Sequence, residues 1–223
     1  MKLTVKVEQD EFTAKVAQAF DLDFSGEITT EIPDFKFPPY NSYNIGLVVG
    51  ASGSGKSTIL SKGLWHDVEQ SPSDFDYWNP KWGFSLWQKN KAIVSHFNSP
   101  DEAIEKLHAC GLASVPTLCK PYHVLSNGEK YRAKFARLLE DDLVMDEFTS
   151  EVNRETAKSL CVSVSKYIRK KDLKNIVLAS CHKDIIDWLQ PDWVFDCDTG
   201  EKYENENVLA NMKRVARITI GAE

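Results

Sequence analysis

The first candidate for chemistry is a glycine-rich stretch with a lysine near its end. Residues 50–58 read GASGSGKST and fit the phosphate-binding (Walker A) pattern G-x-x-x-x-G-K-[ST]. Glycines let consecutive backbone N–H groups turn toward phosphate oxygens, and the following helix adds the positive end of its dipole. The lysine then reaches the β- and γ-phosphates, and the next hydroxyl ligates Mg²⁺. The predicted phosphate-site residues are Gly50, Ser52, Gly53, Ser54, Gly55, Lys56, Ser57 and Thr58.

A pair of acids follows a short apolar run later in the chain. Leu143-Val144-Met145 reads as a buried strand, and Asp146 and Glu147 come directly after it. Ligands bind at the carboxyl ends of the strands in open α/β sheets. We therefore expect Asp146 to support Mg²⁺ and Glu147 to polarise an attacking water.

Two further groups are candidates for contact with phosphate. Ser126 and Glu129 form a capping-box pattern at the start of a helix, and a helix N-terminus attracts anions. His182 follows a predicted strand that ends near Ser180, where its ring can hydrogen-bond a γ-phosphate. Taken alone, the pattern at Ser126 and Glu129 also fits an ordinary helix cap, and His182 also fits a structural role.

The elements that must position these groups alternate along the chain. Apolar runs predict strands over 45–49, 143–145, 176–180 and 193–196, and helical patterns cover 56–66, 99–111, 126–140, 152–171 and 184–189. Alternation of this kind predicts an α/β fold with a mostly parallel central sheet. We expect one domain over 1–223, with an antiparallel β-rich lead-in over 1–44, a short helical subdomain over about 87–140 and a tail over 204–223.

Composition limits the classes of function. The 223 residues are 42% hydrophobic, which is ample for a core, and the net charge of −6 argues against a protein defined by general affinity for nucleic acid. No run approaches the length of a transmembrane helix, and no apolar signal region follows the N-terminus. The five cysteines include no C-x-x-C pair and predict free thiols. We expect a soluble, cytoplasmic protein.

Three other patterns have rival interpretations. Zinc-type ligands occur at His108, Cys110, Cys119 and His123, but the first two should face apart on a helix, so ordinary roles are favoured. The aromatic stretch over 75–87 lacks the interleaved basic residues of a base-stacking platform and favours a local aromatic cluster. The basic cluster over 166–174 complements a helix C-terminus, with a nucleic-acid face as the alternative.

The order of the motifs resembles that of the ABC-type ATPases. Residues 125–129 read LSNGE, which is similar to the family's signature sequence, and they stand between the phosphate loop and the acidic pair. The resemblance covers about residues 45–200, with the S-C-H triplet near its end. It implies a P-loop NTPase fold of the ABC type that binds ATP and Mg²⁺. In that fold Lys56 and Ser57 hold phosphates and metal, Asp146 supports the metal, Glu147 is the general base and His182 is the switch histidine.

The same resemblance implies a head-to-tail homodimer with two ATP molecules between the protomers. Ser126 and Gly128 would contact the γ-phosphate held by the other subunit. Residues 148–150 resemble the segment at which two subunits touch, and Asn153 stands near the place of an acid in the family pattern. Gln88 is the candidate for the glutamine loop, and Tyr40 for the aromatic residue that stacks on adenine.

The interval from Lys56 to Ser126 is 70 residues, which is shorter than in transporter ATPases of this family. The chain therefore resembles a small stand-alone member that is not part of a transporter. We expect ATP hydrolysis to drive a soluble partner or a nucleic-acid process. The alternatives are an energy-coupling subunit of a membrane transporter and a regulatory module that senses ATP without hydrolysing it.

Overall fold

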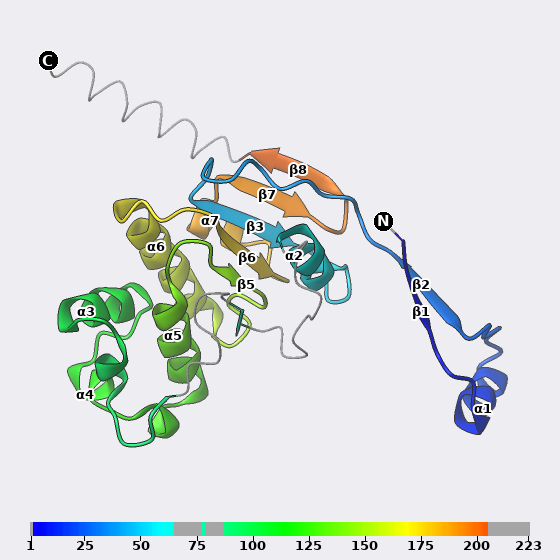
Figure 1. The fold of residues 1–223 in the computed structure, drawn as a ribbon, viewed down its shortest axis with the longest axis horizontal. Helices are drawn as coiled ribbons and strands as arrows, with labels where there is room; N and C mark the ends of the chain where they lie inside the picture. The colour runs from blue at the N-terminus through cyan, green and yellow to red at the C-terminus, as the bar shows by residue number, and fades with distance from the viewer. Residues whose placement is uncertain (1, 65–76, 79–86, 205–223) are drawn as a thin grey trace, which may run out of the picture.

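A mixed sheet carries the predicted site. The computed structural model describes residues 2–64, 77–78 and 87–204, and within them six strands form this sheet in the order β4-β5-β6-β3-β7-β8 (Figure 1). The four inner strands are parallel, and the two edge strands are antiparallel to their neighbours. The bounds are β3 (Ile45–Val49), β4 (Tyr77–Trp78), β5 (Val144–Met145), β6 (Ile176–Ser180), β7 (Trp193–Asp196) and β8 (Glu201–Glu204). The expected mostly parallel central sheet is confirmed.

Strand β3 lies between two parallel neighbours and is buried along its whole length. Its side chains alternate between the faces of the sheet, so that Leu47 joins the core beneath one set of helices and Val48 joins the core on the other face. Gly46 is required here because a Cβ at this position would lie 2.0 Å from Cζ2 of Trp193. A continuous apolar run fits a strand that is covered on both faces.

Helices cover the two faces unequally. On one face α2 (Lys56–Leu64) packs beside the segment that leads into β3, and on the other face a larger layer of helices encloses most of the core (Figure 1). That layer contains η1 (Ile93–His96), α3 (Pro100–Ala109), α4 (Val115–Leu118), η2 (Tyr122–Val124), α5 (Asn127–Leu138), α6 (Arg154–Lys170) and α7 (Ile185–Leu189). Each helix within residues 2–64 and 87–204 is too short or too polar to cross a bilayer.

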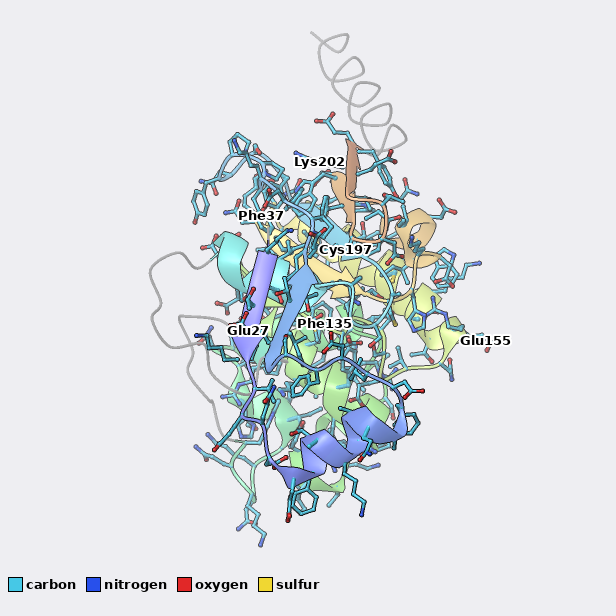
Figure 2. All side chains as sticks on the ribbon, turned by 90° about the vertical axis from the view of Figure 1, so that its right-hand side faces the viewer. Glu27, Phe37, Phe135, Glu155, Cys197 and Lys202 are labelled. Carbon is cyan, nitrogen blue, oxygen red and sulfur yellow. The ribbon has the colours of Figure 1, made fainter. Side chains whose placement is uncertain are left out.

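The N-terminal part differs from its prediction. Strands β1 (Lys2–Lys6) and β2 (Glu27–Glu31) form the expected antiparallel pair, but α1 (Glu11–Ala19) lies between them. The sequence analysis did not predict this helix, which Asp10 starts with a capping box to Thr13. None of the side chains of α1 is buried. Figure 1 shows the pair and the helix extending away from the sheet, and Figure 2 views the molecule from that side.

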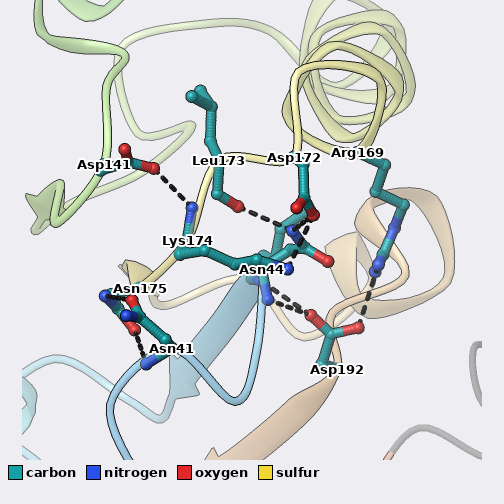
Figure 3. Close-up of polar contacts among 10 residues, drawn as sticks. Asn41, Asn44, Asp141, Arg169, Asp172, Leu173, Lys174, Asn175 and Asp192 are labelled. Carbon is teal, nitrogen blue, oxygen red and sulfur yellow. Dashed lines mark hydrogen bonds and ion pairs between the residues drawn. The ribbon is translucent and has the colours of Figure 1, made fainter.

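A polar network fixes the amino ends of the inner strands (Figure 3). Asp192 accepts the N–H groups of Asn44 and Ile45 at 2.8 Å each, and its other oxygen accepts from Arg169 at 3.0 Å. Asn44 donates in turn to the carbonyl oxygen of Leu173 at 2.7 Å. The network ties the starts of β3 and β7 to the end of α6, so the opposite, carboxyl ends of the strands are held in a fixed register.

Two predicted features lie wholly or largely outside the described residues. The tail over 204–223 is described only at Glu204. Of the aromatic stretch, Phe75, Trp82 and Phe84 are not described, whereas Trp87 stacks on Tyr122 with ring centroids 4.6 Å apart.

Candidate active site

The glycine-rich stretch forms the connection between β3 and α2. Gly50, Gly53 and Gly55 have φ values of 155°, 81° and 94°, which favour glycine. Gly55 is also sterically confined, because a Cβ there would lie 2.9 Å from Cγ2 of Ile32. The N–H of Ile59 donates to the carbonyl oxygen of Gly55 at 2.9 Å and closes the first turn of α2. The N–H groups at the start of α2 are therefore presented at the carboxyl end of β3, as an anion site requires.

Lys56 is held over this loop. Its side chain is 5% exposed, and its ammonium donates to the carbonyl oxygens of Gly50 at 3.0 Å and Ala51 at 2.8 Å. The charge is therefore placed beside the loop that presents the backbone N–H groups. This is the arrangement in which a lysine can counter the charge of a polyphosphate.

The loop and the acidic pair meet at one hydrogen bond. The Ser57 hydroxyl donates to Oδ2 of Asp146, which is 89 residues further along the chain. Asp146 is 6% exposed at the carboxyl end of β5, and its Oδ1 accepts the N–H of Glu147 at 2.8 Å. A hydroxyl and one carboxylate are hard oxygen donors of the kind that Mg²⁺ takes when phosphates and water complete its shell. The donor set therefore fits a magnesium nucleotide.

The zinc alternative finds no support in the described residues, which contain no group of three or more His, Cys, Asp or Glu side chains placed to hold a metal. His108 is exposed, whereas Cys110 is fully buried in the core. Burial raises the pKa of the Cys110 thiol, so the thiolate that zinc requires is disfavoured.

Glu147 lies on a tightly constrained loop. The Glu147 side chain is exposed, and Ser150 donates its hydroxyl to Oε2 of Glu147 at 2.5 Å. The N–H of Phe148 donates to the carbonyl oxygen of Ala179 on β6 at 2.7 Å. Glu147 and Thr149 have φ values of 52° and 72°, which non-glycine residues adopt rarely. The loop thus presents the carboxylate next to Asp146.

Ser126 and Glu129 form the predicted capping box at the start of α5. Glu129 accepts from the N–H and the hydroxyl of Ser126 at 2.9 Å each, and these bonds lower the pKa of the Glu129 carboxyl. Ser126 and Asn127 are exposed, and Gly128 is half-buried. The N-terminus of α5 therefore lies at the surface, which suits contact with an anion from outside the protomer.

His182 lies just beyond β6, and its N–H donates to the hydroxyl of Ser180 at 3.1 Å. The next residue, Lys183, pairs with Asp196 at 2.7 Å and Asp198 at 3.0 Å, which raises the pKa of Lys183 to about 12. Asp198 also accepts the N–H of Ala51 in the phosphate loop at 2.9 Å. This link between Lys183 and the loop was missed by the sequence analysis, although two acids at the end of β7 were a visible signal.

The remaining two candidates are placed differently. The side chain of Gln88 is exposed, and its backbone N–H donates to Nε2 of His96 at 3.0 Å. Tyr40 donates its hydroxyl to Asp142 at 3.0 Å. Asp142 precedes β5 whereas Asp146 follows it, so Tyr40 lies at the opposite end of the sheet from the phosphate loop. This position does not favour Tyr40 as the residue that stacks on adenine.

Comparison with known proteins gives a fold likeness only. No family model matches the chain, and no curated protein matches it. The chain resembles solved ATP-binding cassettes. One is the dimeric, post-hydrolysis state of the ATP-binding cassette MJ0796 bound to ADP and Pi. Its sequence is 14% identical, the TM-score is 0.49, and the match covers 80% of this chain and 89% of that chain. Another is the dimeric structure of MJ0796 described as a bacterial ABC transporter cassette, with 14% identity, a TM-score of 0.48, and coverage of 77% and 84%. A likeness at this level assigns no residue a role.

Proposed function

We propose that this chain is an ATPase of the ABC type, which hydrolyses ATP to ADP and phosphate at the interface of a head-to-tail homodimer. The observation that carries the proposal is the hydrogen bond between Ser57 and Asp146. It joins a phosphate-binding loop to an acidic strand end, which are the two parts that hold a magnesium nucleotide in phosphate-loop enzymes. Both belong to the carboxyl edge of a parallel sheet, where such ligands bind.

The chemistry follows from the charges that the loop and strand present. Lys56 and the N–H groups at the start of α2 neutralise phosphate oxygens, and Ser57 and Asp146 would hold Mg²⁺. When bound, this ion neutralises charge on the β- and γ-phosphates. Glu147 orients a water and accepts its proton. The water oxygen forms a bond to the γ-phosphorus, the bond from that phosphorus to the bridging oxygen breaks, and ADP leaves with the electron pair.

The second half of each site comes from a second copy. The exposed tip of α5, with Ser126 and Gly128, contacts the γ-phosphate held by the partner. Closing two copies around two nucleotides, and reopening them after hydrolysis, would perform work on a soluble partner or a nucleic-acid complex. The residue after His182, Lys183, pairs with Asp198, which accepts the N–H of Ala51 in the phosphate loop. This neighbourhood supports His182 as the residue that responds to loss of the γ-phosphate.

Replacement of the base tests the proposal. Glu147→Gln keeps the shape of the side chain and removes its basicity, so we expect ATP affinity to persist while turnover falls by about 100-fold or more. ATP should also hold this variant as a dimer, measured by solution mass with and without nucleotide. Glu155→Gln, at an exposed acid in the first turn of α6, is the matched control and should behave as wild type. Unchanged turnover in Glu147→Gln would remove Glu147 from the role of base.

A further inference from the structure

One face of α5 holds the loop that carries Glu147. Gly128, Tyr131 and Phe135 are spaced three and four residues apart, so they share this face. A Cβ on Gly128 would lie 3.7 Å from the carbonyl oxygen of Glu151. The ring centroids of Phe135 and Phe148 are 5.3 Å apart. Between these two contacts, the Tyr131 hydroxyl accepts the N–H of Thr149 at 3.0 Å. The helix therefore contacts the loop through Tyr131 and Phe135, and Gly128 leaves room for the backbone at Glu151.

The middle contact is the one that fixes the backbone. Thr149 is fully buried with a φ of 72°, a left-handed conformation that is unfavourable for a residue with a Cβ. Such a conformation persists only where its surroundings determine it. The Tyr131 hydroxyl is itself inside the core, because the side chain is 3% exposed. Without this acceptor, the buried N–H of Thr149 would lose this hydrogen bond, and the backbone between Phe148 and Ser150 would lose one of its constraints.

The constraint continues from Thr149 to the carboxylate. Ser150 follows directly, donates its N–H to the carbonyl oxygen of Glu147 at 3.1 Å and donates its hydroxyl to Oε2 of Glu147 at 2.5 Å. The direction of the Glu147 side chain therefore depends on where Ser150 lies, and Ser150 lies where Thr149 places it. A chain of two hydrogen bonds joins the Tyr131 hydroxyl to the carboxylate.

We propose that Tyr131 is a positioning residue for Glu147, which acts through Thr149 and Ser150. The proposal rests on the proposed function, in which Glu147 accepts the proton of the attacking water. Tyr131 also lies on the helix whose exposed tip carries Ser126, five residues earlier. An anion bound at that tip is thereby connected to the base of the same subunit, so the two sites of a dimer are linked through α5.

Removal of a single oxygen tests the proposal. Tyr131→Phe keeps the ring in the core and deletes the acceptor of the Thr149 N–H. We expect kcat to fall about tenfold through misorientation of the base, while KM for ATP changes less than about twofold because Lys56 and Ser57 are untouched. Tyr167→Phe, at a half-buried tyrosine on α6, is the matched control and should keep wild-type kcat. Wild-type kcat in Tyr131→Phe would overturn the proposal.

A second variant keeps the test decisive if Tyr131→Phe does not fold. Ser150→Ala is at an exposed position and removes the hydrogen bond to Glu147, and kcat should again fall with KM unchanged. Both changes are then combined with Glu147→Gln and measured by single-turnover hydrolysis. In that background neither Tyr131→Phe nor Ser150→Ala should lower the rate further, because there is no longer a base to orient. An equal loss in that background would mean general damage and overturn the positioning role. If Glu147→Gln alone leaves turnover unchanged, it is the proposed function that fails.

Discussion

The phosphate loop contains two glycines that differ in one measurable respect. Gly53 and Gly55 both have left-handed backbones, with φ of 81° and 94°. A Cβ on Gly53 would meet nothing within 4 Å, whereas a Cβ on Gly55 would lie 2.9 Å from Cγ2 and 3.3 Å from Cγ1 of Ile32. Ile32 is 4% exposed and cannot move away without disturbing its own packing. Replacing each glycine by alanine therefore separates a backbone cost from a steric one.

The two costs have different magnitudes. Gly53→Ala carries only the left-handed backbone cost, and we expect the free energy of unfolding to fall by about 1–2 kcal/mol. Gly55→Ala carries the same cost and the overpacking against Ile32, which adds about 1–3 kcal/mol. Urea denaturation, followed by intrinsic fluorescence, measures both variants without nucleotide, so effects on phosphate binding do not enter the comparison.

Truncation of Ile32 identifies the source of the difference. In an Ile32→Ala background both γ-carbons that meet the added Cβ are gone, so Gly53→Ala and Gly55→Ala should destabilise equally. Two results would refute the reasoning. One is equal destabilisation by the two alanines in the wild-type background, and the other is a difference that survives the truncation of Ile32.

Two further predictions concern the tip of α5. The hydrogen bonds from Ser126 lower the pKa of Glu129 below its ordinary value of 4.5. The ionised carboxylate therefore stabilises the folded protein above that pH. This contribution to stability is lost as the pH falls through the lowered pKa of the folded state. The difference in free energy of unfolding between wild type and Glu129→Gln should therefore shrink as the pH is lowered, as measured by urea titrations at several pH values. A difference that stays constant with pH would contradict this role of Glu129. Ser126→Arg should leave ATP affinity of the single chain intact but abolish ATP-dependent dimerisation and turnover, measured by solution mass and phosphate release. Ser99→Arg, which removes a comparable helix cap on α3, is the control. If turnover and dimer assembly survive in Ser126→Arg, the tip of α5 does not contact the nucleotide held by the other subunit.

Local patterns predicted the parts of the fold that depend on local physics. The strands at 45–49, 176–180 and 193–196 were recognisable because short apolar runs bounded by polar residues suit buried strands. The phosphate loop was recognisable because its backbone requires glycine at fixed intervals. Asn153 accepts the N–H of Thr156 at 2.9 Å and caps α6, a local role that its sequence position also allowed.

The missed features depend on contacts between distant segments. Helix α1 was not predicted because the strands on either side of it dominated the pattern. Its apolar residues Phe12 and Val16, and Phe20 at its C-cap, are exposed. The contact of Tyr131 with Thr149 spans 18 residues and leaves no periodic trace in the sequence. The position of Tyr40 was missed for a related reason, because proximity in sequence to β3 does not reveal at which end of the sheet an aromatic side chain lies.

The position of β3 between β6 and β7 has a consequence for motion. Its backbone amides are bonded to both parallel neighbours and shielded on both faces, so they exchange hydrogen with water only when the whole sheet separates. The glycine loop begins directly after the last residue of this strand, and Ser52 and Gly53 at its tip are exposed. The exposed tip is therefore joined to a strand that stays closed for as long as the protein remains folded.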